Sequence, residues 1–87
     1  MGWCCVHIPS SRVFDATNRT FLSLLKSEHR GDPTIDCPVY GAPANDKDGY
    51  CYYFSPPAAV QHKMFLKAWD GFDVPEPKHL KTMTRIV

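Results

Sequence analysis

Two cysteines and a histidine have the side-chain chemistry of a metal site. Cys5 and His7 lie in the apolar run over residues 3–8, and Cys51 lies in the aromatic run over residues 50–54. Because side chains alternate between the faces of a strand, Cys5 and His7 share one face if the first run is a strand. Neighbouring strands bring facing side chains within about 5 Å, and thiolate and imidazole groups hold zinc or copper. Cys5, His7 and Cys51 are therefore the predicted ligands of a zinc or copper ion.

The alternative is that these residues pack in the protein and bind no metal. The sequence contains no CxxC pair, and a fourth ligand would have to come from His62 or Cys37. Unpaired cysteine is among the most buried residue types. We therefore favour the interpretation that the chain holds no cofactor.

The same cysteine and histidine are poorly placed for catalysis. Side chains two positions apart on one strand stand about 7 Å from each other, so Cys5 cannot pass a proton directly to His7. The acidic residues fall in expected loops and helix ends, where solvation and turn formation account for them. We name no catalytic residue and favour a non-enzymatic role.

One face of the predicted sheet offers a surface for binding. Phe54 directly precedes the helix cap Ser55, where an apolar residue packs onto the first turn, so Phe54 and Tyr52 are expected to point towards the helices. The opposite face then carries aromatic rings that a monomer rarely leaves in water. We interpret the chain as a binding module that pairs with itself as a homodimer or docks another protein. The predicted interaction face consists of Trp3, Cys5, His7, Cys51 and Tyr53.

If Tyr50 and Tyr52 pointed to the open face of the sheet instead, the aromatic run would suit the binding of nucleic acid. The run Asp48-Gly49-Tyr50-Cys51-Tyr52-Tyr53 resembles the aromatic strand motif of the RNA-recognition motif family, and the following Pro-Pro-Ala-Ala helix is similar to that family's second helix. The resemblance covers residues 48–71. It implies that Tyr50 and Tyr52 stack bases of single-stranded RNA on an open sheet. The chain departs from the motif at Asp48, where the family has a basic residue, and at Ser55, where it has an aromatic one.

The order of segments predicts the elements that position these residues. Apolar runs and amphipathic stretches alternate as β-α-β-β-α-β, which is typical of an α+β split βαβ (ferredoxin-like) sandwich with two helices on one face of a four-stranded antiparallel sheet. We expect residues 72–77 to be a connector and the final strand to lie beside the first. The strands are expected over residues 3–8, 37–43, 50–54 and 80–87, and the helices from Asp15 or Thr17 to Arg30 and from Ser55 to Gly71. The residues expected to face the core are Phe14, Phe21, Leu22 and Leu25 in the first helix and Val60, Met64 and Ala68, with Phe65 and Trp69 alongside them, in the second.

Length and charge limit the remaining possibilities. Eighty-seven residues make one domain over 1–87, and the formal charge of +1 has its signs interspersed along the chain. Binding to duplex DNA is disfavoured, because that mode needs a basic stripe. The first apolar run is too short for a signal peptide or a membrane span, so we expect a cytoplasmic protein with reduced cysteines.

Overall fold

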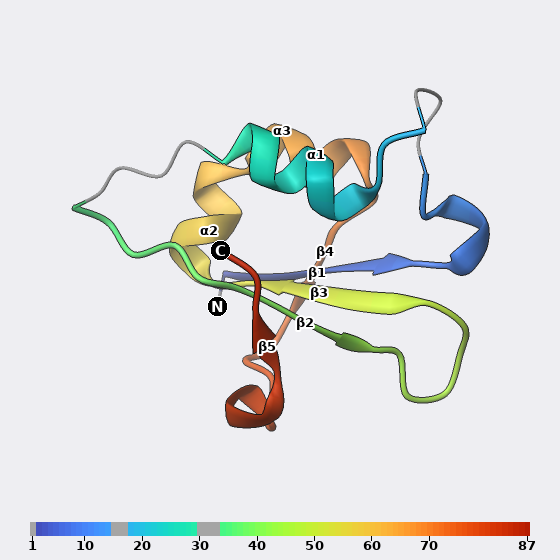
Figure 1. Ribbon diagram of the computed structural model, residues 1–87. Coiled ribbons are helices and arrows are strands. Elements are labelled where there is room, and N and C mark those ends of the chain that lie inside the picture. The colour runs from blue at the N-terminus through green and yellow to red at the C-terminus, as the bar shows by residue number, and fades with distance from the viewer. Residues whose placement is uncertain (1, 15–17, 30–33) are drawn as a thin grey trace.

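A five-stranded antiparallel sheet with the strand order β4-β1-β3-β2-β5 forms one layer of the fold (Figure 1). The computed structural model describes residues 2–14, 18–29 and 34–87. The three helices of these residues lie on one side of the sheet, and the predicted α+β class is confirmed. The strands are β1 (Trp3–Ile8), β2 (Val39–Pro43), β3 (Tyr50–Phe54), β4 (Phe72–Val74) and β5 (Thr84–Arg85).

β1 and β3 lie in the interior of the sheet, where strands with neighbours on both sides are apolar on most residues. Their register places Val6 opposite Tyr52 and Cys4 opposite Phe54. Val6 and Phe54 are fully buried, and Tyr52 packs against the same core. The predicted inward direction of Tyr52 and Phe54 is therefore confirmed.

The first helix begins later than the sequence predicts. α1 (Phe21–Glu28) is capped by Thr20, whose side-chain oxygen accepts a hydrogen bond from a backbone amide in the first turn at 3.0 Å. A hydroxyl in this position satisfies an amide that has no partner within the helix. The predicted cap residues Asp15 and Thr17 and the predicted last residue Arg30 lie outside the described residues.

The predicted second helix is divided into α2 (Pro56–Gln61) and α3 (Lys63–Ala68) by a break at His62. Ser55 caps α2 as predicted, with its Oγ accepting a hydrogen bond from the Ala58 amide at 3.4 Å. The His62 side chain points into the core at the break and is only 2% exposed. Within the described chain, no helix has the length and apolar character needed to cross a membrane.

The buried side of α2 and α3 differs from the prediction. The structure leaves Val60 and Met64 78% and 84% exposed, and Ala68 is exposed as well. The expected and the observed sets both recur every four residues, so helical spacing does not decide which of them faces the sheet. The buried set is Ala58, His62 and Leu66. The predicted inward direction of Trp69 and Phe65 is confirmed, since Trp69 belongs to the core and Phe65 packs against it.

The C-terminal segment also pairs differently from the prediction. β4 arises where a connector was expected, and it pairs with β1 so that Phe72 lies opposite Cys5. The expected last strand instead contains a 3-10 helix, η2 (Leu80–Thr82), and the short β5, which pairs with β2 at the other edge. Gly71 accounts for the return of the chain to the sheet directly after α3. Its amide donates to the Leu66 carbonyl at 2.7 Å, and the chain leaves the helix towards β1.

Residues 75–83 consequently run from one edge of the sheet to the other, and we call them the crossing segment. They pass the sheet on the side without helices, which we call the outer face (Figure 1). Thr82 and Met83 line a hollow there together with Cys51 and Tyr53 of β3. The fold therefore supplies part of its own cover on the face opposite the helices.

Candidate functional site

The register of β1 and β3 gathers the five residues predicted to form an interaction face. Cys5 lies opposite Tyr53, and His7 lies opposite Cys51. Trp3 continues the same row of β1. The alternate residues of β1 belong to the core, so these five side chains are directed to the outer face.

Three of the five are not accessible in the way that the sequence suggests. Trp3 is 8% exposed, Cys5 is 3% exposed and Cys51 is 9% exposed. These three side chains are therefore largely covered, and Thr82 and Met83 of the crossing segment lie beside Cys51 on this face. The alternating pattern of residues 80–87 gave no sign of the path of the crossing segment.

Two adjoining hollows remain on the outer face. The first, which we call the outer-face hollow, has a volume of about 210 Å³ and is lined by Cys5, His7, Cys51 and Tyr53, with Phe72 and Val74 of β4 at its margin. Residues 44–47 of the loop between β2 and β3 close another side of it. The second has about 200 Å³ and shares Cys51 and Tyr53 with the first.

The Cys5 thiol and the Tyr53 hydroxyl, which line the outer-face hollow, are uncharged at neutral pH. Burial raises the pKa of the Cys5 thiol to about 12, and the nearby Cys51 adds to the shift. Burial also raises the pKa of the Tyr53 hydroxyl to about 12. A thiol that stays protonated at neutral pH is a weak nucleophile, so Cys5 has the character of a packing residue.

His7 is tied to the loop that closes the hollow. Its Nε2 lies 2.7 Å from the Asp48 carbonyl oxygen, which only accepts, so Nε2 carries the proton. The Asp48 carboxylate accepts hydrogen bonds from the Ser10 amide at 2.8 Å and from the Ser10 hydroxyl at 2.6 Å. These bonds from Ser10 lower the pKa of Asp48. The loop is therefore held to the end of β1 through both residues.

The predicted metal ligands share a face but do not form a complete ligand set. Within the described ranges, no group of three or more His, Cys, Asp or Glu residues is placed to hold a metal ion. The two suggested fourth ligands are also out of reach, because Cys37 belongs to the core cluster and His62 contacts Phe54 on the helix side.

The two tyrosines of the RNA interpretation lie on the other face. Tyr50 is paired with Ile8 and Tyr52 with Val6, and these partners belong to the core beneath the helices. The Tyr52 ring lies 4.7 Å from the Phe21 ring of α1, centroid to centroid. Base stacking needs rings on an open sheet face. Tyr52 lies under the helical layer, so its ring is not on such a face. Tyr50 is 44% exposed, and the RNA interpretation stays a prediction.

A pair of histidines joins α1 to the break between α2 and α3. His29 Nδ1 lies 3.1 Å from His62 Nε2, so one neutral ring donates to the other. Phe54 and Phe65 contact the His62 ring from the sheet and from α3. Burial, followed by the neighbouring His29, lowers the pKa of His62 below its ordinary value of 6.5, and the Glu28 carboxylate opposes this effect.

Acidification is expected to destabilise the protein through His62. Below pH 6.5 the unfolded chain takes up a proton that the folded state resists, so the free energy of unfolding falls with pH until the lower folded-state pKa is passed. Urea denaturation on both sides of that pH measures the change. His62→Gln should reduce the pH dependence, whereas His79→Gln, at an exposed position, should retain it. An unaltered dependence in His62→Gln would contradict the assignment.

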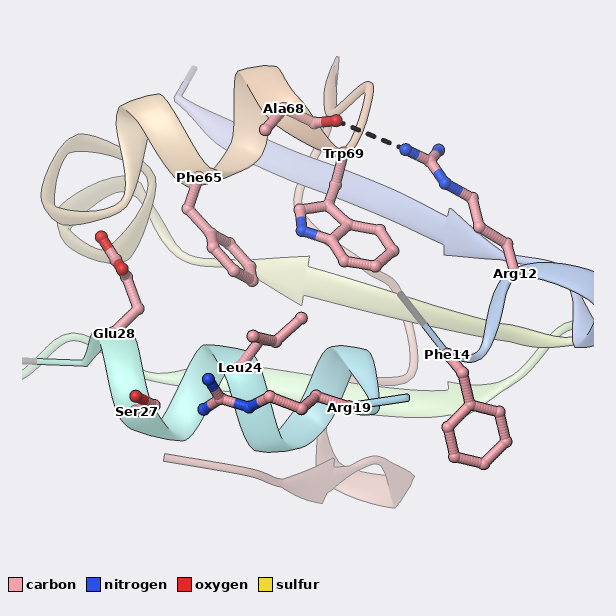
Figure 2. A pocket seen from close by; sticks show the side chains of 9 residues that line it. All are labelled: Arg12, Phe14, Arg19, Leu24, Ser27, Glu28, Phe65, Ala68 and Trp69. Atoms are coloured by element: carbon pink, nitrogen blue, oxygen red, sulfur yellow. Dashed lines mark hydrogen bonds between the residues drawn. The ribbon is translucent and has the colours of Figure 1, made fainter. Parts of the chain in front are cut away.

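A cavity on the helical side was not predicted. It has a volume of about 580 Å³ and opens between α1 and α3; we call it the helical cleft (Figure 2). Phe14, which the sequence places in the core, is 59% exposed at its rim. Leu24 rises from α1, and Phe65 and Trp69 descend from α3 (Figure 2). Its other lining residues are Arg12, Arg19, Ser27, Glu28 and Ala68.

Arg12 is held at one end of the cleft by three contacts. Its Nη1 lies 3.0 Å from Asp70 Oδ2, its Nη2 donates to the Ala68 carbonyl at 3.4 Å, and its guanidinium carbon lies 4.8 Å from the centre of the Trp69 ring. The Trp69 ring is fixed in turn by an edge contact with Phe21 at 5.0 Å. Local sequence patterns do not reveal this arrangement, because Arg12 and Asp70 are 58 positions apart.

Comparisons with known proteins identify no relative of this chain. No family model matches it, and neither a curated protein nor a solved structure matches it. Its function is therefore inferred from the outer-face hollow and the helical cleft themselves.

Proposed function

We propose that this chain is a small non-enzymatic binding module that pairs with a second copy of itself through the outer face. The observation that carries the proposal is the position of Phe72. Its side chain is 49% exposed at the margin of the outer-face hollow. An exposed aromatic ring beside a hollow on the same face is self-complementary under a two-fold axis, since each copy presents both features.

The size of the hollow fits an aromatic ring. A cavity of about 150 Å³ holds benzene, and the outer-face hollow measures about 210 Å³. In the proposed dimer, Phe72 of each copy enters the hollow of the other and covers Cys5 and Tyr53. The protonated thiol and hydroxyl of these two residues suit an apolar partner, because neither carries a charge that has to be desolvated. The charged Asp46 and Lys47 line the loop side of the hollow.

The strand order supports the expected fold type as part of the same proposal. When β5 is left out, the strand order is β4-β1-β3-β2. In the chain, α1 lies between β1 and β2, and α2 and α3 lie between β3 and β4. This is the arrangement of a split βαβ (ferredoxin-like) sandwich. We propose that the chain has this core, with β5 and the crossing segment added to it.

Phe72→Glu is expected to abolish self-association. The substitution places a carboxylate against the protonated Cys5 thiol and Tyr53 hydroxyl of the partner's hollow, and burying a carboxylate beside them costs several kcal/mol. Light scattering and sedimentation at micromolar concentration should find dimers of the unaltered chain and monomers of the variant. The fold should persist in the variant, since Phe72 lies on a short edge strand and is half exposed.

Val60→Glu is the matched control. Val60 is 78% exposed on α2, on the helical side, so the same change there should leave the dimer intact. A chain that is monomeric at all concentrations tested would overturn the proposal. Dissociation by Val60→Glu with no effect of Phe72→Glu would overturn it as well, by placing the contact on the helices.

A further inference from the structure

The helical cleft combines the properties of a small-molecule site. Its volume of about 580 Å³ lies within the range of about 300–1,000 Å³ that ligand pockets occupy. Its apolar walls are Leu24 on one side and Phe65 and Trp69 on the other (Figure 2). Such sites carry a few polar groups that orient the ligand, and here those groups are charged side chains at the ends of the cleft.

The polar groups are arranged with opposite charge at the two ends. Figure 2 shows Arg12 beside Trp69 at one end and the Glu28 carboxylate at the other. Arg19 lies along α1 between them and lines the same cavity. An anion is therefore favoured at the end that holds Arg12, and the apolar walls favour a ring between the two ends.

Arg12 is positioned to receive a carboxylate. A guanidinium has five N–H donors in a planar fork, and the contacts with Asp70 and Ala68 use two of its nitrogen atoms, Nη1 and Nη2. The Asp70 side chain is 83% exposed, and an ion pair with so exposed a partner contributes little stability. A ligand carboxylate can replace Asp70 and form the paired hydrogen bonds that arginine makes with carboxylates.

We infer that the helical cleft binds a small aromatic carboxylate, with the carboxylate at Arg12 and the ring against Trp69 and Phe65. This site lies on the opposite side of the sheet from the proposed dimer contact, so each can be tested without the other. The ordered aromatic contacts of Trp69 with Phe21, at 5.0 Å, and with Phe65, at 6.2 Å, hold the wall in place before a ligand arrives. A preformed wall lowers the entropic cost of binding.

The test is a titration with 2-naphthoate followed by the indole N–H signals of a ¹⁵N-labelled sample. The chain has two tryptophans, and Trp3 lies on the outer face, so it serves as an internal reference. The Trp69 signal should shift on titration while the Trp3 signal stays in place. The neutral analogue 2-naphthamide should bind more weakly, because it lacks the carboxylate.

Arg12→Gln is expected to weaken 2-naphthoate binding by about tenfold or more, as the loss of a charged hydrogen bond would, and to weaken 2-naphthamide binding much less. Arg12→Lys keeps the charge without the fork and should have an intermediate effect. Arg85→Gln is the matched control, because Arg85 is also a half-exposed arginine paired with an aspartate, Asp36, away from the cleft. Equal binding of the two probes, a shift at Trp3 in place of Trp69, or no shift at millimolar probe would overturn the inference.

Discussion

Replacement of Gly49 by alanine is expected to lower the free energy of unfolding by about 3 kcal/mol or more, since backbone strain and overpacking each cost about 1–3 kcal/mol. Gly49 has φ +102°, a conformation that side chains rarely permit, and an added Cβ would lie 2.1 Å from the Ile8 carbonyl oxygen and 2.8 Å from Pro9 Cα. Both are backbone atoms at the end of β1. The end of β1 must move away to relieve the contact, and this disturbs the bonds between Asp48 and Ser10.

Urea denaturation of Gly49→Ala against the unaltered chain measures this loss, and Gly41→Ala is the control. An added Cβ at Gly41 would meet side-chain atoms only, at 3.2 Å from Tyr52 Cε1 and 3.3 Å from Ile86 Cδ1. These side chains can shift, so a loss of about 1 kcal/mol is expected there. Equal losses for the two variants would show that the end of β1 does not restrain Gly49 as described.

Phe21→Ala is expected to cost about 3–5 kcal/mol, the range for removing a buried phenylalanine ring. Phe21 is 2% exposed, and its ring lies 4.7 Å from Tyr52, 5.2 Å from Phe65 and 5.0 Å from Trp69 between ring centres. The ring thus joins α1 to the sheet and to α3 at once. Its loss leaves a cavity and removes the edge contact that fixes Trp69.

Thermal or urea denaturation gives the stability change, and the Trp69 indole signal reports the local effect. The control is Phe14→Ala, because Phe14 is 59% exposed and surface substitutions usually change stability by no more than about 0.5 kcal/mol. If Phe21→Ala and Phe14→Ala cost the same, α1 does not pack on the sheet through Phe21.

The interior strands were predictable because each carries its own signal. The alternation of Cys4, Val6 and Ile8 with Cys5 and His7 separates the two faces of β1, and the cap at Ser55 fixes the direction of Phe54. The structure confirms both assignments. In these strands the residues that decide the geometry are neighbours in sequence.

The remaining differences depend on contacts between distant residues. Val60 and Leu66 are both suited to a core, and only the sheet selects Leu66 for burial. β4 forms because the chain turns at Gly71 directly back to β1, although its sequence, followed by Pro75 and Pro77, resembles a connector. The helical cleft needs Arg12 beside Trp69, and no local spacing relates these two residues.

The positions of β4 and β5 at opposite edges of the sheet have a consequence for biosynthesis. β1, β2 and β3 are made first, but the outer edges of β1 and β2 find their partners only when residues 72–85 have left the ribosome. Unpaired strand edges are templates for aggregation. The nascent chain therefore carries two such edges until β4 emerges, and the β2 edge stays unpaired until β5 follows the crossing segment out of the ribosome.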